Sequence, residues 1–380
     1  MEKKRIYWID GLKLFACMCV FYSHFQGFFM GACENDMGYG TTFQTILESP
    51  FNILKNGNLW MCMFCVISGY FASKKKVDSF RKLLSAIWKR YLRFVIPFFV
   101  VNLLTFVLYY TVGIPTAKYG ELFGNSWFGE FYDFKITLWI VLRASLKLTS
   151  ELNSPLWMIL PLFVGTCFIY LCKYLLEKMP AGIVNSFVIA VALVVIVYFP
   201  GIHDAYLYTF ITCMGAFLGV IIEKNLWKIT SVPVNSMVLL FVYFLLGYAQ
   251  DKIISYIPVQ LPQCTVNYLN AIYSILFLTV ISQLQGVQRF FSMPFFKKNG
   301  KLSFGIYVLH WLALSTFSLY FYGLLEGSIS IAVLFVVNFI VTSAVVAIGA
   351  KIFNECVEQR LMKIPDQLME RVTKRMKINI

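Results

Sequence analysis

Long uninterrupted stretches of apolar residues set the strongest constraint on this chain. They are about 17–22 residues long, the length that an α-helix needs to cross about 30 Å of hydrocarbon. Hydrophobic residues make up 59% of the 380 residues and charged residues only 14%, whereas soluble domains are typically about 45–50% apolar and about 25% charged. The sequence therefore predicts an all-α, polytopic integral membrane protein. It excludes a soluble enzyme, a secreted disulfide scaffold and a disordered regulator.

Ten such stretches predict about ten transmembrane helices, with both termini on the same side of the membrane. The expected spans are residues 12–30, 53–73, 94–112, 156–173, 183–199, 207–222, 234–249, 266–284, 302–322 and 329–350. A shorter stretch, residues 136–149, contains Arg143 and Lys147 and is expected to lie at the interface or to re-enter the membrane. Residues 1–350 are thus predicted to form one transmembrane domain, and residues 351–380 a basic cytoplasmic tail.

Positive charge is distributed unevenly between the expected loops. If the N-terminus is cytoplasmic, 27 of the 33 Lys and Arg residues fall on the cytoplasmic side and six do not. Cytoplasmic loops of membrane proteins carry this excess of Lys and Arg. The distribution places both termini in the cytoplasm and explains most of the net charge of +14. No nucleic-acid partner is therefore expected, although such a charge would suggest one in a soluble protein.

The ten cysteines lie mostly within apolar stretches, where they are expected to act as small buried hydrophobic residues. Cys62 and Cys65 have the spacing of a CxxC motif but lack flanking metal ligands, so no metal site is predicted. Cys33 and Cys264 fall in expected outer loops. Their spacing alone leaves open whether they form a disulfide.

The first expected span contains an ionisable residue, His24, and such residues within a membrane tend to be functional. Hydrogen bonding between packed helices is the alternative role for this histidine. Lys13 precedes it by eleven residues, about three helical turns plus about 20°, so both side chains project from one face about 16 Å apart. Asp10 is expected to orient Lys13 through an i,i+3 pair. A long ligand with an anionic head and a reactive far end would fit this face.

The densest basic segment leads into the third expected span and ends with Lys89, Arg90 and Arg93. Arg90 and Arg93 are three residues apart, so both guanidinium groups can face one direction on a helix. Arginine suits bidentate recognition of phosphate. The alternative is ordinary anchoring by snorkelling side chains, which we favour for Lys74–Lys76 but not for Arg93.

Several short motifs, taken together and in order, resemble those of the membrane acyltransferase type 3 family. Lys13-x10-His24 resembles its (Arg/Lys)-x10-His signature, and Arg90-x-x-Arg93 resembles its RxxR motif. The remaining similarities are the Ser-Gly-aromatic element that contains Ser68, the Leu156-Trp157 pair, and the GxxSfxxYxxH element Gly300–His310 with Tyr307. Family members more often have Arg at the position of Lys13. A lysine ammonium still attracts phosphate but lacks bidentate geometry.

This resemblance implies a multi-pass enzyme of the bacterial cytoplasmic membrane that transfers an acyl group to a hydroxyl. The donor is acyl-CoA, usually acetyl-CoA, and the acceptor is a saccharide or glycolipid of the cell envelope, with no metal required. His24 is then catalytic, either as a general base or as a transient acyl carrier, and the sequence leaves this choice open. The residues expected to bind CoA are Lys13, Ser68, Lys89, Arg90, Arg93 and His310, with Asp10, Trp157 and Tyr307 in support.

Other interpretations stay open at this point. His310 is either a packing histidine bonded to Ser303 or Tyr307, or a residue that lines the CoA path. The aromatic residues within 113–155, Trp127 among them, either stack on a sugar or anchor the chain at the interface. A transporter or flippase for lipid-linked saccharides is the alternative function. It predicts inverted repeats and broken helix pairs, and no convincing halves are visible. The expected partners are acyl-CoA, a saccharide or glycolipid acceptor and the lipid bilayer, and a homo-oligomer is compatible with the sequence.

Overall fold

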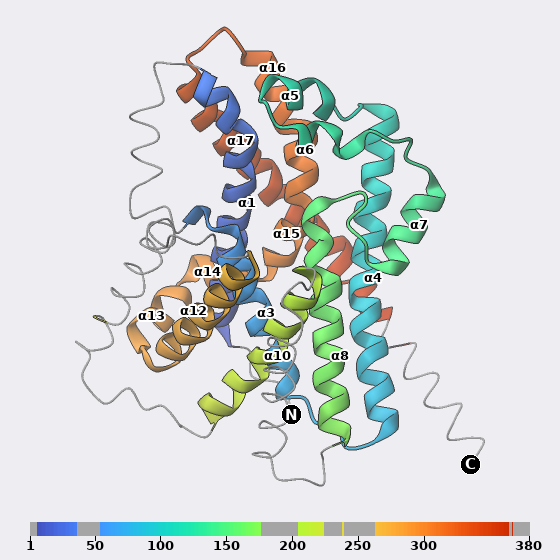
Figure 1. The fold of residues 1–380 in the computed structure, drawn as a ribbon, viewed down its shortest axis with the longest axis vertical. Helices are drawn as coiled ribbons and strands as arrows, with labels where there is room; N and C mark the ends of the chain where they lie inside the picture. The colour runs from blue at the N-terminus through green and yellow to red at the C-terminus, as the bar shows by residue number, and fades with distance from the viewer. Residues whose placement is uncertain are drawn as a thin grey trace. The chain divides into compact units, whose positions relative to one another are not determined.

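The computed structural model describes residues 6–35, 54–175, 204–223, 238, 263–364 and 367. Every regular element within these ranges is helical (Figure 1), which confirms the all-α prediction for this part of the chain. The expected spans 183–199 and 234–249 lie outside the described residues, apart from position 238. The count of ten spans and the cytoplasmic location of both termini therefore stay predictions.

Four helical stretches within the described ranges are long and apolar enough to cross a membrane: Phe80–Thr111, Ser154–Leu175, Pro294–Leu325 and Ile331–Glu358. A fifth is added if Leu269–Gln283 and Gln285–Phe291, which are bent by 99° at their junction, count as one broken span. Helix α1 (Tyr7–Asn35) has 29 residues and is therefore about 43 Å long, but polar residues such as Lys13 and His24 lower its mean hydropathy. These lengths and compositions are those of a multi-pass membrane protein.

The described helices belong to two compact units, and the chain passes from one unit to the other several times. The first unit contains α1, the part of α4 (Phe80–Thr111) from Val95 onward, α5 (Thr116–Leu122), α6 (Ser126–Gly129), η2 (Glu130–Tyr132), α7 (Leu138–Lys147), α14 (Pro294–Asn299), η4 (Gly300–Leu302), α15 (Ser303–Ala313), η5 (Leu314–Ser318), α16 (Leu319–Leu325), α17 (Ile331–Phe353), η6 (Asn354–Glu358) and η7 (Leu361–Lys363). The second contains α3 (Gly57–Ser73), α4 up to Phe94, α8 (Ile159–Leu175), α10 (Asp204–Glu223), α12 (Gln263–Gln283) and α13 (Gln285–Phe291). The short η3 (Ser154–Met158) spans the boundary between them.

Glycine residues bring the helix backbones of the second unit into direct contact. A Cβ atom at Gly69 of α3 would lie 1.8 Å from the carbonyl oxygen of Thr212 on α10, and one at Gly215 would lie 2.1 Å from the carbonyl oxygen of Val66. A Cβ at Gly165 of α8 would lie 2.7 Å from the carbonyl oxygen of Thr209. Small residues are enriched at helix interfaces in membranes because close packing there replaces the hydrophobic effect as the source of association. The three glycines thus lock α3 and α8 onto α10.

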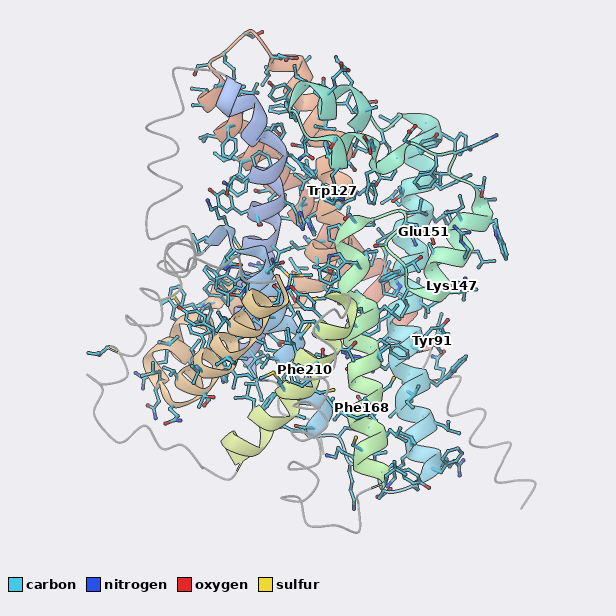
Figure 2. All side chains as sticks on the ribbon, viewed as in Figure 1. Tyr91, Trp127, Lys147, Glu151, Phe168 and Phe210 are labelled. Atoms are coloured by element: carbon cyan, nitrogen blue, oxygen red, sulfur yellow. The ribbon has the colours of Figure 1, made fainter. Side chains whose placement is uncertain are left out.

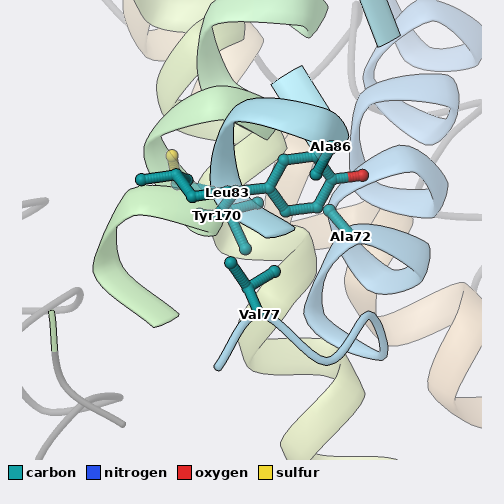
Figure 3. Packing of buried hydrophobic residues seen from close by; sticks show 7 residues of the cluster. Ala72, Val77, Leu83, Ala86 and Tyr170 are labelled. Atoms are coloured by element: carbon teal, nitrogen blue, oxygen red, sulfur yellow. The ribbon is translucent and has the colours of Figure 1, made fainter. Parts of the chain in front are cut away.

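A buried cluster joins the end of α3, the start of α4 and α8 in the second unit (Figure 3). Its members are Ala72, Val77, Leu83, Ala86, Ile169, Tyr170 and Cys213. The sequence predicts the third span from residue 94, where the basic residues stop, whereas α4 begins at Phe80. The earlier start follows from Leu83 and Ala86, which bury one face of this basic segment. Arg90 and Arg93 therefore lie on the same continuous helix as the span.

Aromatic side chains hold α1 against the last helices of the first unit. Phe21 stacks on Phe339 of α17 with ring centroids 5.6 Å apart, and Phe25 contacts Phe335 at 5.1 Å. Close to the middle of α17, Asn338 bonds with Ser318 through both its side-chain oxygen and its nitrogen, each at 3.0 Å. Such bonds fix neighbouring helices where no water competes. The packing of α1, α15 and α17 positions the histidines described below.

The stretch 136–149 contains a short helix, α7 (Leu138–Lys147), in agreement with the sequence prediction of a helix too short to span. Helix α7 has ten residues, too few to cross a bilayer. The side chain of Thr137 caps its N-terminus by accepting a hydrogen bond from the backbone N–H of Ile140 at 3.3 Å, and Leu148 ends it in the left-handed conformation with φ of 56°. Arg143 forms an ion pair with Glu151 just beyond the helix, so its charge is compensated locally.

Candidate functional site

Two histidines from distant parts of the sequence stack on each other in the first unit. The rings of His24 on α1 and His310 on α15 have centroids 5.3 Å apart and an interplanar angle of 30°. The ring of Trp311 lies edge-on to His24 at 5.9 Å. His310 is 1% exposed, whereas His24 is only partly buried. His24 is thus the accessible member of the pair.

The hydrogen bonds of His310 fix which of its ring nitrogens carries the proton. Its Nδ1 lies 2.7 Å from the carbonyl oxygen of Tyr307 and 3.2 Å from that of Ile306. A carbonyl oxygen only accepts, so we assign the proton to Nδ1 and a free lone pair to Nε2. In the described part of the chain this buried Nε2 has no hydrogen-bond partner. The bond to Tyr307 agrees with a packing role, but the unpartnered Nε2 requires another explanation.

A chain of hydrogen bonds supports the wall beside the two histidines. Trp311 donates from its indole N–H to the Tyr132 hydroxyl at 3.2 Å, and that hydroxyl donates to the carbonyl oxygen of Leu152 at 3.0 Å. Burial raises the pKa of Tyr132 above its usual range, which keeps the hydroxyl proton in place as the donor. Tyr307 also bonds through its hydroxyl to the carbonyl of Pro155. Leu152 in the loop before η3 and Pro155 within η3 therefore hold α15 near His310.

The basic end of α1 packs against the segment that precedes α15. Lys13 forms the expected pair with Asp10, with Nζ and Oδ1 3.3 Å apart. A Cβ at Gly300 would lie 3.0 Å from Asp10 atoms, and the thiol of Cys17 bonds to the carbonyl oxygen of Ser303 at 3.0 Å. The start of the GxxSfxxYxxH element thus contacts α1 near Lys13. Its end, at His310, contacts α1 again at His24.

A partly buried guanidinium, with its Nε atom fully buried, lies in the second unit. Arg90 on α4 donates from Nη2 to the Ser68 hydroxyl on α3 at 2.7 Å. Ser68 and Thr166 of α8 share a hydrogen bond at 3.5 Å, in which Ser68 is the donor because Thr166 gives its own proton to the Leu162 carbonyl at 2.7 Å. The guanidinium also lies over the Phe94 ring, 4.7 Å from its centroid. These contacts fix the side chain between three helices.

Arg90 differs from Lys76 and Lys82 in having no carboxylate partner among the described residues. Among the described residues no Asp or Glu forms an ion pair with it, and its buried Nε has no hydrogen-bond partner. In contrast, Asp78 pairs with Lys82 at 2.5 Å and with Lys76 at 3.5 Å, and the bond from Lys82 lowers the pKa of this carboxyl. A buried cation without a counter-ion is costly unless an anion binds to it. Arg90 therefore marks a candidate anion site.

The remaining predicted site residues lie in several places. Lys89 is partly buried and Arg93 exposed on α4 beside Arg90. Trp157 packs against Tyr208 of α10, with ring centroids 4.9 Å apart. The structure thus joins Lys13 to Asp10, His24 to His310, and Arg90 to Ser68.

Sequence reasoning did not single out Thr166 or Trp311 as site residues, although each carried a signal. Thr166 is a hydroxyl residue within an otherwise apolar stretch, and Trp311 directly follows His310. The side chains of Cys33 and Cys264 lie outside the described residues, so their pairing is not addressed. In the described ranges no cluster of His, Cys, Asp or Glu residues could hold a metal ion.

Comparison with known proteins bears on what these residues do. No curated protein sequence and no solved structure gives a significant match. A family model described as an acyltransferase domain matches residues 6–349. This range contains both histidines of the stacked pair, the Lys13 end of α1 and the partly buried Arg90. The chain therefore belongs to the acyltransferase type 3 family.

Proposed function

We propose that this protein is a bacterial cytoplasmic-membrane O-acyltransferase. It transfers an acyl group, acetyl when acetyl-CoA is the donor, from acyl-CoA to a hydroxyl of a saccharide or glycolipid of the cell envelope. The observation that carries the proposal is the stacked pair of His24 and His310, in which one imidazole is accessible and the other is buried with a fixed tautomer. Family membership supplies the class of reaction.

Arg90 and the residues around it are proposed to bind the phosphates of CoA. The guanidinium has five N–H donors in a rigid fork, and among the described residues only the Ser68 hydroxyl accepts a hydrogen bond from it. Phosphate oxygens accept charge-assisted bonds from such a group. Lys89 and Arg93, one turn or less away on α4, add positive potential that attracts the anion. Ser68 contributes by holding the guanidinium in place.

Within the first unit, helix α1 carries a cation and a distant base that suit a long thin ligand. Lys13 and His24 lie on one face about 16 Å apart along the axis, and Asp10 orients the Lys13 ammonium. An extended pantetheine arm with a thioester at its end matches this arrangement of a cation and a distant base. The arm also carries amide N–H groups, which the free lone pair of His310 Nε2 can accept. This gives the unpartnered nitrogen a role in binding the donor.

Acyl transfer at His24 follows a simple course. The acceptor hydroxyl oxygen attacks the thioester carbonyl carbon while the neutral imidazole of His24 takes the hydroxyl proton. A C–O ester bond forms, the C–S bond breaks, and the departing CoA thiolate takes the proton back from the histidine. The products are the O-acyl ester and free CoA. In the alternative course an imidazole nitrogen of His24 attacks the thioester carbonyl, the C–S bond breaks, and CoA leaves with the imidazole proton as the free thiol. The acceptor hydroxyl then attacks the acyl-imidazole, the C–N bond breaks as the C–O ester bond forms, and the hydroxyl proton goes to the released histidine.

The test is a reconstitution with purified protein in lipid vesicles. Acetyl-CoA is supplied together with glycerol or a set of methyl pyranosides, and both CoA release and the acetylated product are followed by mass spectrometry. We expect acceptor-dependent CoA release in step with ester formation. Absence of any acetylated hydroxyl product from a folded preparation that binds acetyl-CoA would overturn the proposal.

A further inference from the structure

One exposed tryptophan contacts Trp311, the buried ring that lies beside His24. Trp127 of α6 is 53% exposed and is labelled in Figure 2. Its ring centroid is 5.3 Å from that of Trp311, and Trp311 is fully buried and 5.9 Å from His24. The two centroid distances, 5.3 and 5.9 Å, limit the separation of Trp127 and His24 to about 11 Å. A mono- or disaccharide can bridge this distance.

The segment that carries Trp127 is held rigidly. Helices α5 and α6 are in backbone contact, because a Cβ at Gly120 would lie 2.3 Å from the Cα of Gly129. Asn125 caps α6 by accepting from the Phe128 N–H at 3.1 Å. Phe128 in turn stacks on Phe28 of α1 with centroids 4.0 Å apart. The exposed indole is therefore fixed in position by its neighbours before any ligand binds.

The chemistry of this surface suits a sugar ring. An aromatic face offers an apolar platform of large area, and the C–H face of a pyranose is apolar in the same way. The carboxylates of Glu130 and Asp133 are exposed just beyond α6 and can accept hydrogen bonds from sugar hydroxyls. Phe131, which contacts Trp311 at 5.0 Å, extends the aromatic surface. Apolar and acceptor groups thus occur together within a few residues.

We propose that Trp127 is the platform on which the acceptor saccharide stacks, with its reacting hydroxyl directed to His24. The inference rests on the acyl transfer proposed above and adds the acceptor subsite. Interfacial anchoring is the competing role for an exposed tryptophan. Trp139 on α7 serves as the matched control, because it belongs to the same unit and is 66% exposed but has no aromatic ring partner among the described residues.

The experiment compares Trp127→Ala, Trp127→Phe and Trp139→Ala in the purified full chain. Acetyl transfer is measured to methyl pyranosides and to glycerol, an acceptor without a ring. A stack as strong as an aromatic pair in proteins corresponds to about tenfold in affinity. We therefore expect Trp127→Ala to raise the KM for a pyranoside about tenfold, with Trp127→Phe intermediate. In Trp127→Ala the KM for acetyl-CoA and the rate with glycerol should be unchanged. Trp139→Ala should have the wild-type KM values for both substrates.

The experiment distinguishes failure of the Trp127 platform from failure of the proposed acyl transfer. Equal KM values for a pyranoside in Trp127→Ala and Trp139→Ala would overturn the platform. So would a wild-type protein that acetylates glycerol but no pyranoside, and in both cases acyl transfer itself would stand. Failure of the wild-type protein to acetylate any hydroxyl would instead refute the proposed function, and the platform with it.

Discussion

Replacing Arg90 by Ala is expected to weaken acyl-CoA binding without unfolding the protein. Arg90 donates from Nη2 to Ser68, while its buried Nε–H has no acceptor among the described residues. If a CoA phosphate accepts from this group, the variant loses at least one charge-assisted hydrogen bond. Such a bond is worth about 1.5–3 kcal/mol, which corresponds to a rise in Kd of about 10- to 150-fold.

The assay is calorimetric titration of the purified protein with acetyl-CoA. Arg81→Ala is the matched control, because Arg81 is on the same helix but exposed, and its Kd should stay within about threefold because exposed ion pairs contribute little. Arg90→Lys keeps the charge but loses the planar, forked donor group, so its Kd should lie between those of the wild type and Arg90→Ala. A Kd for Arg90→Ala equal to the wild-type value, in a protein with unchanged circular dichroism, would refute the anion site.

Two further predictions concern packing and the second histidine. Gly69→Ala places a methyl group 1.8 Å from a backbone oxygen of α10, so it should destabilise the protein by about 1–3 kcal/mol, seen as a lower thermal midpoint. Gly27→Ala, which has nothing within 4 Å of its Cβ, should not lower it, and equal midpoints would contradict the packing account. His310→Phe keeps the ring but removes Nε2, so the Kd for acetyl-CoA should rise about 2- to 10-fold. An unchanged Kd in the folded variant would restrict His310 to packing.

The presence of long apolar helices could be predicted from the sequence because a span is a local property. Any stretch long and apolar enough to cross the bilayer reveals itself without knowledge of its neighbours. The expected span 302–322 falls within the helical stretch Pro294–Leu325, and the expected span 329–350 begins two residues before the stretch Ile331–Glu358. The start of α4 could not be located in this way. Its basic first turns are helical because Leu83 and Ala86 bury against other helices, and this contact is not visible in the local pattern.

The candidate site was predictable residue by residue but not in its connections. His24, Lys13 and Arg90 stand out because charged or ionisable groups are costly within a membrane. Helical periodicity also predicts the pairing of Lys13 with Asp10, since both residues are on one helix. The stacking of His24 on His310 joins residues 286 positions apart, and the bond of Arg90 to Ser68 joins two helices. Such contacts depend on tertiary packing, which no spacing within one segment specifies.

The central claim is that His24 performs the acyl transfer, and single-turnover kinetics with His24→Ala tests it most directly. Acetyl-CoA carrying a labelled acetyl group is bound to wild-type and variant protein, and the labelled ester and any labelled protein are quantified after acceptor is added. Loss of a general base typically costs about 10²–10⁴ in rate. We predict that the variant binds acetyl-CoA with wild-type affinity but forms the ester at least about 100-fold more slowly. Ester formation at the wild-type rate in the variant would contradict the account.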